Sequence, residues 1–248
     1  MNSQSDGHDI SSVNGVKPAD ALPASTKGKA ARIEITDELY ARRGAREWPV
    51  KGRNAQVAPE EVVRKQVDIW LMIGGRGSGK TRAGAEWVNA IANGFMPYVR
   101  GHKGQIALIG ETLADVRDVM IEGPAGILAT GREGKPRFES SRRRVVWETG
   151  MTALVFSSED PESLRGPQFG AAWCDEIGKW KNAEATWDML QFGLRLGARP
   201  QLLATTTPRA TPLMKRLIAD PAAHVTRIKT LENADNLAPG FLERLVKR

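Results

Sequence analysis

A complete G-x-x-x-x-G-K-[ST] element occupies residues 74–81 and reads Gly74-Gly75-Arg76-Gly77-Ser78-Gly79-Lys80-Thr81. It follows an apolar run at 67–73 and precedes 82–92, where apolar side chains recur at helical spacing. A strand, a glycine-rich loop and a helix in this order indicate a phosphate-binding loop. The glycines let backbone N–H groups turn toward phosphate oxygens, and the helix presents its positive end to the same charge. Lys80 is then expected to reach the β and γ phosphates, and Thr81 to ligate Mg²⁺. A dinucleotide-binding loop is excluded, because the glycines fit no G-x-G-x-x-G register.

An acidic pair follows a second apolar run. Residues 171–174 lead directly into Asp175 and Glu176. Nucleotide hydrolysis needs one acidic group in the Mg²⁺ shell and another that orients and activates the attacking water. We therefore expect Asp175, at the strand end, to hold Mg²⁺ and Glu176 to act on the water. Acidic residues often follow buried strands, so the acidic pair indicates a nucleotide site only because a phosphate-binding loop precedes it in the chain.

A third apolar run, 201–204, ends in the hydroxyls of Thr205, Thr206 and Thr207. Hydroxyls at a strand end can sense the γ phosphate or the attacking water. Without context, however, this run is more typical of a plain strand followed by a turn.

Apolar runs alternate with helical patterns from residue 67 onward, which predicts an α/β fold whose mostly parallel sheet is covered by helices on both faces. Residues 1–31 have almost no large apolar side chains, so we expect a disordered tail. Residues 32–66 are interpreted as a lead-in and 67–248 as the nucleotide-binding core. The expected strands are 67–73, 105–110, 144–147, 153–157, 171–174, 201–206 and 225–229, and the expected helices are 82–92, 113–121, 183–194 and 212–218.

The bulk properties fit one soluble α/β domain with tails. The 248 residues carry a net charge of +7, which suits a partner that bears phosphates, although an ordinary basic surface fits as well. The single Cys174 excludes an intramolecular disulfide and is consistent with a reducing cytoplasm. The sequence contains neither an apolar stretch of membrane-spanning length nor an export signal, so no membrane association is expected.

The motifs in this order resemble the ATPase domain of large terminases, the DNA-packaging motors of tailed bacteriophages and of phage-like gene transfer agents. The resemblance covers about residue 45 to the end. It implies a P-loop NTPase fold of the additional-strand, catalytic-glutamate type, and an ATP hydrolase that uses Mg²⁺. The motifs that carry it are the loop with its flanks at 70–88, Leu164-Arg165-Gly166-Pro167-Gln168-Phe169, Trp173-Cys174-Asp175-Glu176 and Thr205-Thr206-Thr207-Pro208-Arg209.

The resemblance also implies roles for single residues. Glu176 would be the catalytic glutamate, and Thr205, Thr206 and Thr207 the motif that couples hydrolysis to movement. Arg76 would brace the γ phosphate of its own subunit, and Arg165 would reach the nucleotide of a neighbouring subunit. An arginine that fixes the local turn fits Arg165 at least as well. Gln56 lies where related motors place an adenine-reading glutamine, but a surface glutamine is equally compatible.

The partners follow from the resemblance alone. A large terminase forms a ring on the portal protein of a procapsid in the host cytoplasm, works with a small terminase subunit and drives double-stranded DNA inward. The family's carboxyl-terminal nuclease domain is expected to be absent, because the chain stops at Arg248. The clusters Arg42-Arg43 with Arg46, and Arg142-Arg143-Arg144, can contact DNA phosphates, although solvated strand ends fit them better. Two alternatives stay open: a helicase-like translocase, and a nucleotide-gated assembly module that scarcely hydrolyses ATP.

Overall fold

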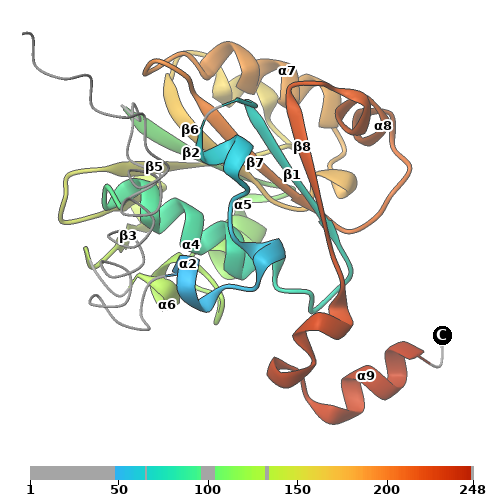
Figure 1. The fold of residues 1–248 in the computed structure, drawn as a ribbon. Coiled ribbons are helices and arrows are strands. Elements are labelled where there is room, and N and C mark those ends of the chain that lie inside the picture. Colours follow the sequence, from blue (N-terminus) through green and yellow to red (C-terminus); the bar gives the residue numbers. More distant parts are fainter. Residues whose placement is uncertain (1–47, 65, 96–103, 132–133, 247–248) are drawn as a thin grey trace, which may run out of the picture. The chain divides into compact units, whose positions relative to one another are not determined.

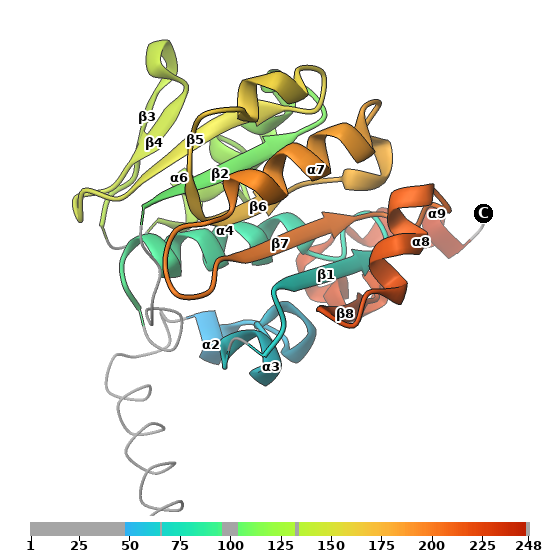
Figure 2. The ribbon, with the colours of Figure 1, turned by 90° about the horizontal axis from the view of Figure 1, so that it is seen from above.

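The computed structural model describes residues 48–64, 66–95, 104–131 and 134–246. Within them the strands are β1 (Ile69–Gly74), β2 (Gln105–Gly110), β3 (Arg137–Glu139), β4 (Arg144–Val146), β5 (Thr152–Ser157), β6 (Phe169–Cys174), β7 (Gln201–Thr206) and β8 (Ala223–Ile228). They form one sheet in the order β3-β4-β5-β2-β6-β7-β1-β8 (Figure 2). The strands from β5 to β8 in this order are parallel, and β3 and β4 add an antiparallel edge. The predicted mostly parallel sheet is confirmed.

Strand β7 lies between β1, which leads into the phosphate-binding loop, and β6, which leads into the acidic pair. It pairs in parallel with both: Thr205 lies opposite Met72 of β1, and Leu203 lies opposite Trp173 of β6. A strand inserted at this place is the additional strand that the sequence resemblance implies, so the predicted type of P-loop NTPase fold is also confirmed.

Helices cover both faces of the sheet (Figure 1). Helices α4 (Lys80–Ala92) and α6 (Ile127–Thr130) pack on one face with the π-helical segment η2 (Val116–Ile121), while α7 (Ala183–Gly193) and α8 (Pro212–Ala219) cover the other. The other helical segments are α2 (Trp48–Lys51), η1 (Asn54–Gln56), α3 (Glu60–Val63), α5 (Leu113–Asp115), η3 (Ser140–Arg142), η4 (Pro161–Leu164), η5 (Ile177–Lys179), η6 (Thr230–Asn236) and α9 (Pro239–Val246).

Strand β1 explains why this chain forms a sheet with two covered faces. All its residues are buried, with Trp70 and Met72 in the core layer beneath α4, and Ile69, Leu71 and Ile73 in the layer on the opposite face. A strand buried on both faces is apolar throughout, as is usual in parallel sheets. Polar side chains that form a site must therefore lie at the ends of such strands.

The helices α2, α3, α6 and α9 are not among the expected elements, and two further segments differ from the prediction. The helix expected at 113–121 is a short α5 that continues as η2, whose buried side chains Val116, Met120 and Ile121 have the spacing of the wider π turn. Strand β3 escapes prediction because its sequence, Arg-Phe-Glu, contains a single apolar side chain.

The predicted tail at 1–31 and the first part of the lead-in, 32–47, lie outside the described residues. The described part of the lead-in packs against the core through Ala58 and Val62, and Trp48–Arg248 forms one compact unit. No helix in the described ranges combines the length and the apolar character that a membrane crossing needs.

Candidate active site

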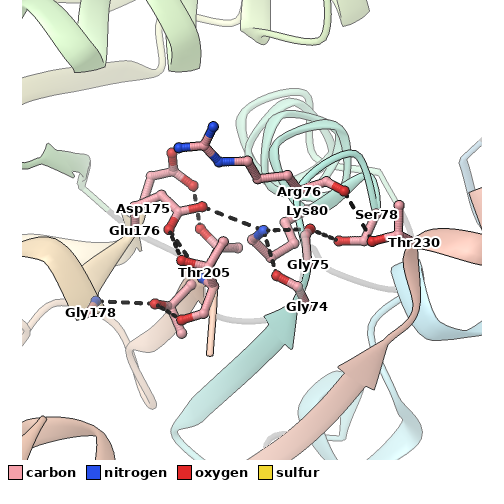
Figure 3. A network of polar contacts seen from close by, with 12 residues as sticks. Gly74, Gly75, Arg76, Ser78, Lys80, Asp175, Glu176, Gly178, Thr205 and Thr230 are labelled. Carbon is pink, nitrogen blue, oxygen red and sulfur yellow. Dashed lines mark hydrogen bonds and ion pairs between the residues drawn. The ribbon is translucent and has the colours of Figure 1, made fainter. Parts of the chain in front are cut away.

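Three of the sequence motifs meet at one edge of the sheet. Strands β1, β7 and β6 are neighbours and run parallel, so their carboxyl ends lie side by side. The phosphate-binding loop follows β1, Thr207 follows β7, and the acidic pair Asp175 and Glu176 follows β6. A network of polar contacts joins these segments (Figure 3). The structure therefore assembles one site from motifs that are far apart in the chain.

The loop owes its shape to glycines with positive φ. Gly77 and Gly79 have φ of 73° and 91°, and Gly79 is the N-cap of α4. Lys80, the first residue of α4, is 6% exposed. Its Nζ donates to the carbonyl oxygens of Gly74 at 2.8 Å and Gly75 at 3.1 Å, and lies 3.4 Å from Glu176 Oε1. The ammonium group thus bridges the loop and the acidic pair.

Glu176 is held by the neighbouring strand end. Its backbone adopts a left-handed conformation with φ of 51°, which is uncommon for a residue with a Cβ. Its Oε2 accepts from the backbone N–H and from Oγ1 of Thr207, both at 3.0 Å. Partial burial raises the pKa of the Glu176 carboxyl, but the Lys80 charge and the two Thr207 bonds outweigh it, so the pKa lies below its ordinary value. Glu176 is therefore ionised and able to accept a proton.

Asp175 has a different environment, although it is the adjacent residue. It is 8% exposed, and this burial raises the pKa of its carboxyl to about 6, with the hydrogen bond from Thr205 acting in the opposite direction. Thr205 Oγ1 donates to Asp175 Oδ1 at 2.5 Å and accepts from Trp173 Nε1 at 3.2 Å. The middle threonine, Thr206, accepts from the Gly178 N–H at 3.1 Å. All three threonines are thus bonded to the segment of the acidic pair.

The oxygen donors at this edge fit Mg²⁺. Thr81 is the second residue of α4 and carries a hydroxyl, and Asp175 carries a carboxylate whose orientation Thr205 fixes. Hard oxygen ligands of this kind, completed by phosphate oxygens, are the ones that Mg²⁺ uses in nucleotide sites. The described residues contain no cluster of His, Cys, Asp or Glu that would form a metal site of another type.

The two candidate arginines lie in different places. Arg76 is part of the loop, and its side chain extends toward the acidic pair in Figure 3. Arg165 precedes the amino end of β6, whereas Asp175 follows the carboxyl end, and its side chain is 70% exposed and 3.2 Å from Glu162 Oε2. The structure therefore brings Arg76 to the site of its own chain and does not bring Arg165 there.

Gln56 lies against the loop and is buried, which rules out a surface glutamine. Its Nε2 donates to the carbonyl oxygen of Gly79 at 2.9 Å, and its Oε1 accepts from Arg53 Nε at 3.0 Å. Both ends of the amide thus bond to the protein, while the reading of adenine by Gln56 stays a prediction.

The basic clusters are only partly described. Arg144 pairs with Glu139 at 2.7 Å within the β3–β4 hairpin, and Arg142 lies 3.8 Å from the same carboxylate. The cluster formed by Arg42, Arg43 and Arg46 falls outside the described residues.

Sequence reasoning missed three polar residues that contact the loop backbone: Arg53, Thr230 and Asn233. Thr230 and Asn233 are 154 and 156 positions from the loop residues that they contact, and no motif surrounds them. Only one feature of the sequence could have indicated Arg53: it is a basic residue three positions before the candidate Gln56.

The comparisons with known proteins agree with this geometry. A family model described as terminase large subunit, T4likevirus-type, N-terminal, matches residues 71–248. No curated protein sequence gives a significant match. Among solved structures, the large terminase of the thermophilic bacteriophage D6E is 14% identical with a TM-score of 0.59, covering 81% of this chain and 47% of that one. Its complex with ADP has a TM-score of 0.58 at 14% identity, covering 77% of this chain and 49% of that chain.

A further solved structure, the ATPase domain of the Thermus phage P74-26 large terminase, is 13% identical with a TM-score of 0.52 and covers 76% of this chain and 88% of that chain. At such identities the likeness concerns the fold, and the chain spans about half the length of the D6E protein. The family model, which matches most of the chain and includes all three motifs of the site, decides the assignment. The chain belongs to the terminase large subunit family, and the model that it matches describes the amino-terminal part of those proteins.

Proposed function

We propose that this chain hydrolyses ATP with Mg²⁺ and couples the reaction to the translocation of double-stranded DNA into a procapsid. The observation that carries the proposal is the position of Glu176 at the carboxyl edge of the sheet. Its carboxylate is oriented by Thr207 and lies 3.4 Å from the phosphate-binding lysine, Lys80. A base, a phosphate-binding cation and a glycine-rich loop at one edge are the parts that phosphoryl transfer to water requires.

In the proposed reaction the loop N–H groups and Lys80 hold the β and γ phosphates, and Arg76 adds charge at the γ phosphate. Thr81 and Asp175 would hold Mg²⁺, which when bound neutralises developing charge on the phosphate oxygens. Glu176, which is ionised at neutral pH and is oriented by Thr207, accepts a proton from the attacking water. Phosphate oxygens compete with Glu176 for the Lys80 ammonium, so nucleotide binding frees the carboxylate to act on water.

The partners belong to the same proposal. We infer that several copies form a ring on a portal protein, with a small terminase subunit delivering the DNA. Support comes from the family membership, because the large terminases are the motor subunits of phage packaging. The same membership argues against the helicase-like alternative. The nucleotide-gated assembly module would scarcely turn over ATP, so phosphate release by the wild type distinguishes it from a motor.

The experiment compares Glu176→Gln with Asp175→Asn. Glu176→Gln keeps the size and a carbonyl oxygen but cannot accept the proton, so ATP affinity should match or exceed wild type while the steady-state rate falls roughly 100-fold or more. Asp175→Asn should weaken Mg²⁺-dependent ATP binding as well as turnover, because it removes charge from the metal shell. Lys80→Ala should lose ATP binding.

The matched control is Glu148→Gln, an exposed glutamate paired with Lys135, which should behave as wild type. Near-wild-type turnover in Glu176→Gln would place the base elsewhere. A wild type that binds ATP yet releases no phosphate, with or without DNA, would favour the assembly module.

A further inference from the structure

The backbone of the phosphate-binding loop is bonded from outside by side chains of two other segments. Four consecutive loop carbonyl oxygens each accept a hydrogen bond from a side chain that does not belong to the loop. Arg76 O accepts from Thr230 Oγ1 at 3.0 Å, Gly77 O from Asn233 Nδ2 at 2.7 Å, Ser78 O from Arg53, and Gly79 O from Gln56 Nε2 at 2.9 Å.

These bonds determine where the loop N–H groups point. In a planar trans peptide unit the carbonyl oxygen and the following N–H point in opposite directions. The Arg76 carbonyl group, which accepts from Thr230, therefore aims the N–H group of Gly77 inward, toward the expected phosphate position. The Gly77 carbonyl group, which accepts from Asn233, belongs to the peptide unit whose Ser78 N–H donates to Gly75 O at 3.3 Å, so this bond fixes the turn of the loop itself. Free rotation of these two peptide units would scatter the Gly77 N–H group and loosen the turn.

The hydrogen bonds that Thr230 and Asn233 donate to the loop, here called the brace, require the η6 segment to lie close to the loop backbone. A Cβ atom on Gly75 would lie 2.6 Å from Thr230 Oγ1, and one on Gly77 would lie 3.1 Å from Leu237 Cδ2. Only glycine at these two positions lets η6, which follows β8, approach the loop backbone. Asn236 Nδ2 donates to Asn233 Oδ1 at 3.1 Å, which turns the Asn233 amide so that its NH₂ group faces the loop.

The geometry points to Thr230 and Asn233 as positioning residues of the phosphate-binding loop. They set the direction of the Gly77 N–H group and the turn of the loop without touching the nucleotide, so the affinity for a nucleoside diphosphate depends on them. This inference rests on the proposed nucleotide binding, but not on hydrolysis or DNA translocation.

The test measures the affinity of the full chain for a fluorescent ADP analogue in Thr230→Val and Asn233→Leu, neither of which adds a charge near the phosphates. Each variant keeps the side-chain size but removes the donor. Each should lower ADP affinity roughly 3- to 10-fold, as expected for the loss of one positioning hydrogen bond. Thr230→Ser, which keeps the hydroxyl, should restore wild-type affinity. Asp235→Asn, an exposed change in the same η6 segment, is the matched control and should have no effect.

Steady-state kinetics separate positioning from a general structural role. The brace acts equally on bound substrate and transition state, so KM for ATP should rise by the same factor while kcat changes little. Unchanged ADP affinity in both folded variants, judged by an unchanged Tm, would overturn the inference. A wild type that binds ADP but does not hydrolyse ATP would refute the proposed function alone, whereas a wild type that binds no ADP would refute both.

Discussion

Adjacent residues in the acidic pair have carboxyl groups whose pKa values shift in opposite directions. Burial raises the pKa of Asp175 to about 6, while Lys80 and Thr207 bring the pKa of Glu176 below its ordinary value in spite of partial burial. Separated pKa values are characteristic of paired carboxylates with different tasks. Both carboxyl groups are nevertheless mainly ionised at neutral pH, as the proposed roles of Glu176 as proton acceptor and Asp175 as metal ligand require.

The Asp175 shift makes a prediction about stability in the nucleotide-free protein with EDTA. Its folded pKa of about 6 exceeds the ordinary 3.8, so the native state binds more protons than the unfolded chain between these values. The free energy of unfolding of the wild type should therefore fall as pH rises through this window, by at most about 3 kcal/mol. The side chain introduced by Asp175→Asn cannot ionise, so this pH-dependent fall in the free energy of unfolding should be absent from the variant.

The variant should therefore be more stable than wild type at pH 7.5, and its advantage should disappear near pH 4. Urea denaturation at several pH values measures the difference, with the exposed Asp235→Asn as a control that should track wild type. An advantage that is independent of pH would show that the Asp175 carboxylate is not the cause.

At the scale of elements, the packing of α4 against β6 positions side chains of the site. A Cβ atom on Gly84 of α4 would lie 2.2 Å from Cε2 of the Trp173 indole. The missing side chain makes room for that ring, whose Nε1 donates to Thr205, which in turn donates to Asp175. Helix propensity favours alanine at this position by about 1 kcal/mol, but the steric demand of the ring favours glycine.

We expect Gly84→Ala to lower the free energy of unfolding by roughly 1–3 kcal/mol and to reduce ATPase activity, because overpacking displaces Trp173 from Thr205. Thermal unfolding and phosphate release measure the two effects. Gly240→Ala in α9, where a Cβ meets nothing within 4 Å, is the matched control and should be neutral or slightly stabilising. In a Trp173→Phe background the cost of Gly84→Ala should shrink, and an equal cost in both backgrounds would contradict the contact.

At the scale of the whole molecule, Arg165 belongs to a surface away from the acidic pair of its own chain. It lines a hollow with Pro167, Met189, Arg195 and the 71% exposed Phe192. An exposed arginine at such a place suits the predicted role toward a neighbouring subunit, since an arginine supplied in trans acts on the transition state.

Arg165→Ala should therefore leave nucleotide affinity near wild type and reduce turnover in the assembled motor roughly 100-fold or more. Mixing the variant with Glu176→Gln subunits, which supply the arginine but not the base, should restore part of the activity. Arg195→Ala, in the same hollow, is the control. Should Arg165→Ala lose the same activity as a proven monomer, the arginine acts within its own chain.

The phosphate-binding loop, the acidic pair, the helices α4, α7 and α8 and every strand but β3 were predictable from the sequence, because each depends on residues that are neighbours along the chain. Glycines at fixed spacing, an apolar strand on one side and a helical pattern on the other specify the loop without reference to distant contacts. The same local reasoning placed Trp173 in the core, where it lies. It failed at β3 and η2, whose short or unusually spaced apolar patterns carry little local signal, and it did not predict α2, α3, α6 or α9.

Only the tertiary structure decided which groups surround these motifs. Thr207 reaches Glu176, and Asn233 reaches the loop, because parallel strands bring their carboxyl ends to one edge of the sheet. The burial that separates the pKa values of Asp175 and Glu176 arises in the same way, from side chains that meet after the strands have paired. Contacts over 154 and 156 positions leave no local pattern in the sequence, because their energy depends on the folded arrangement and not on neighbouring residues.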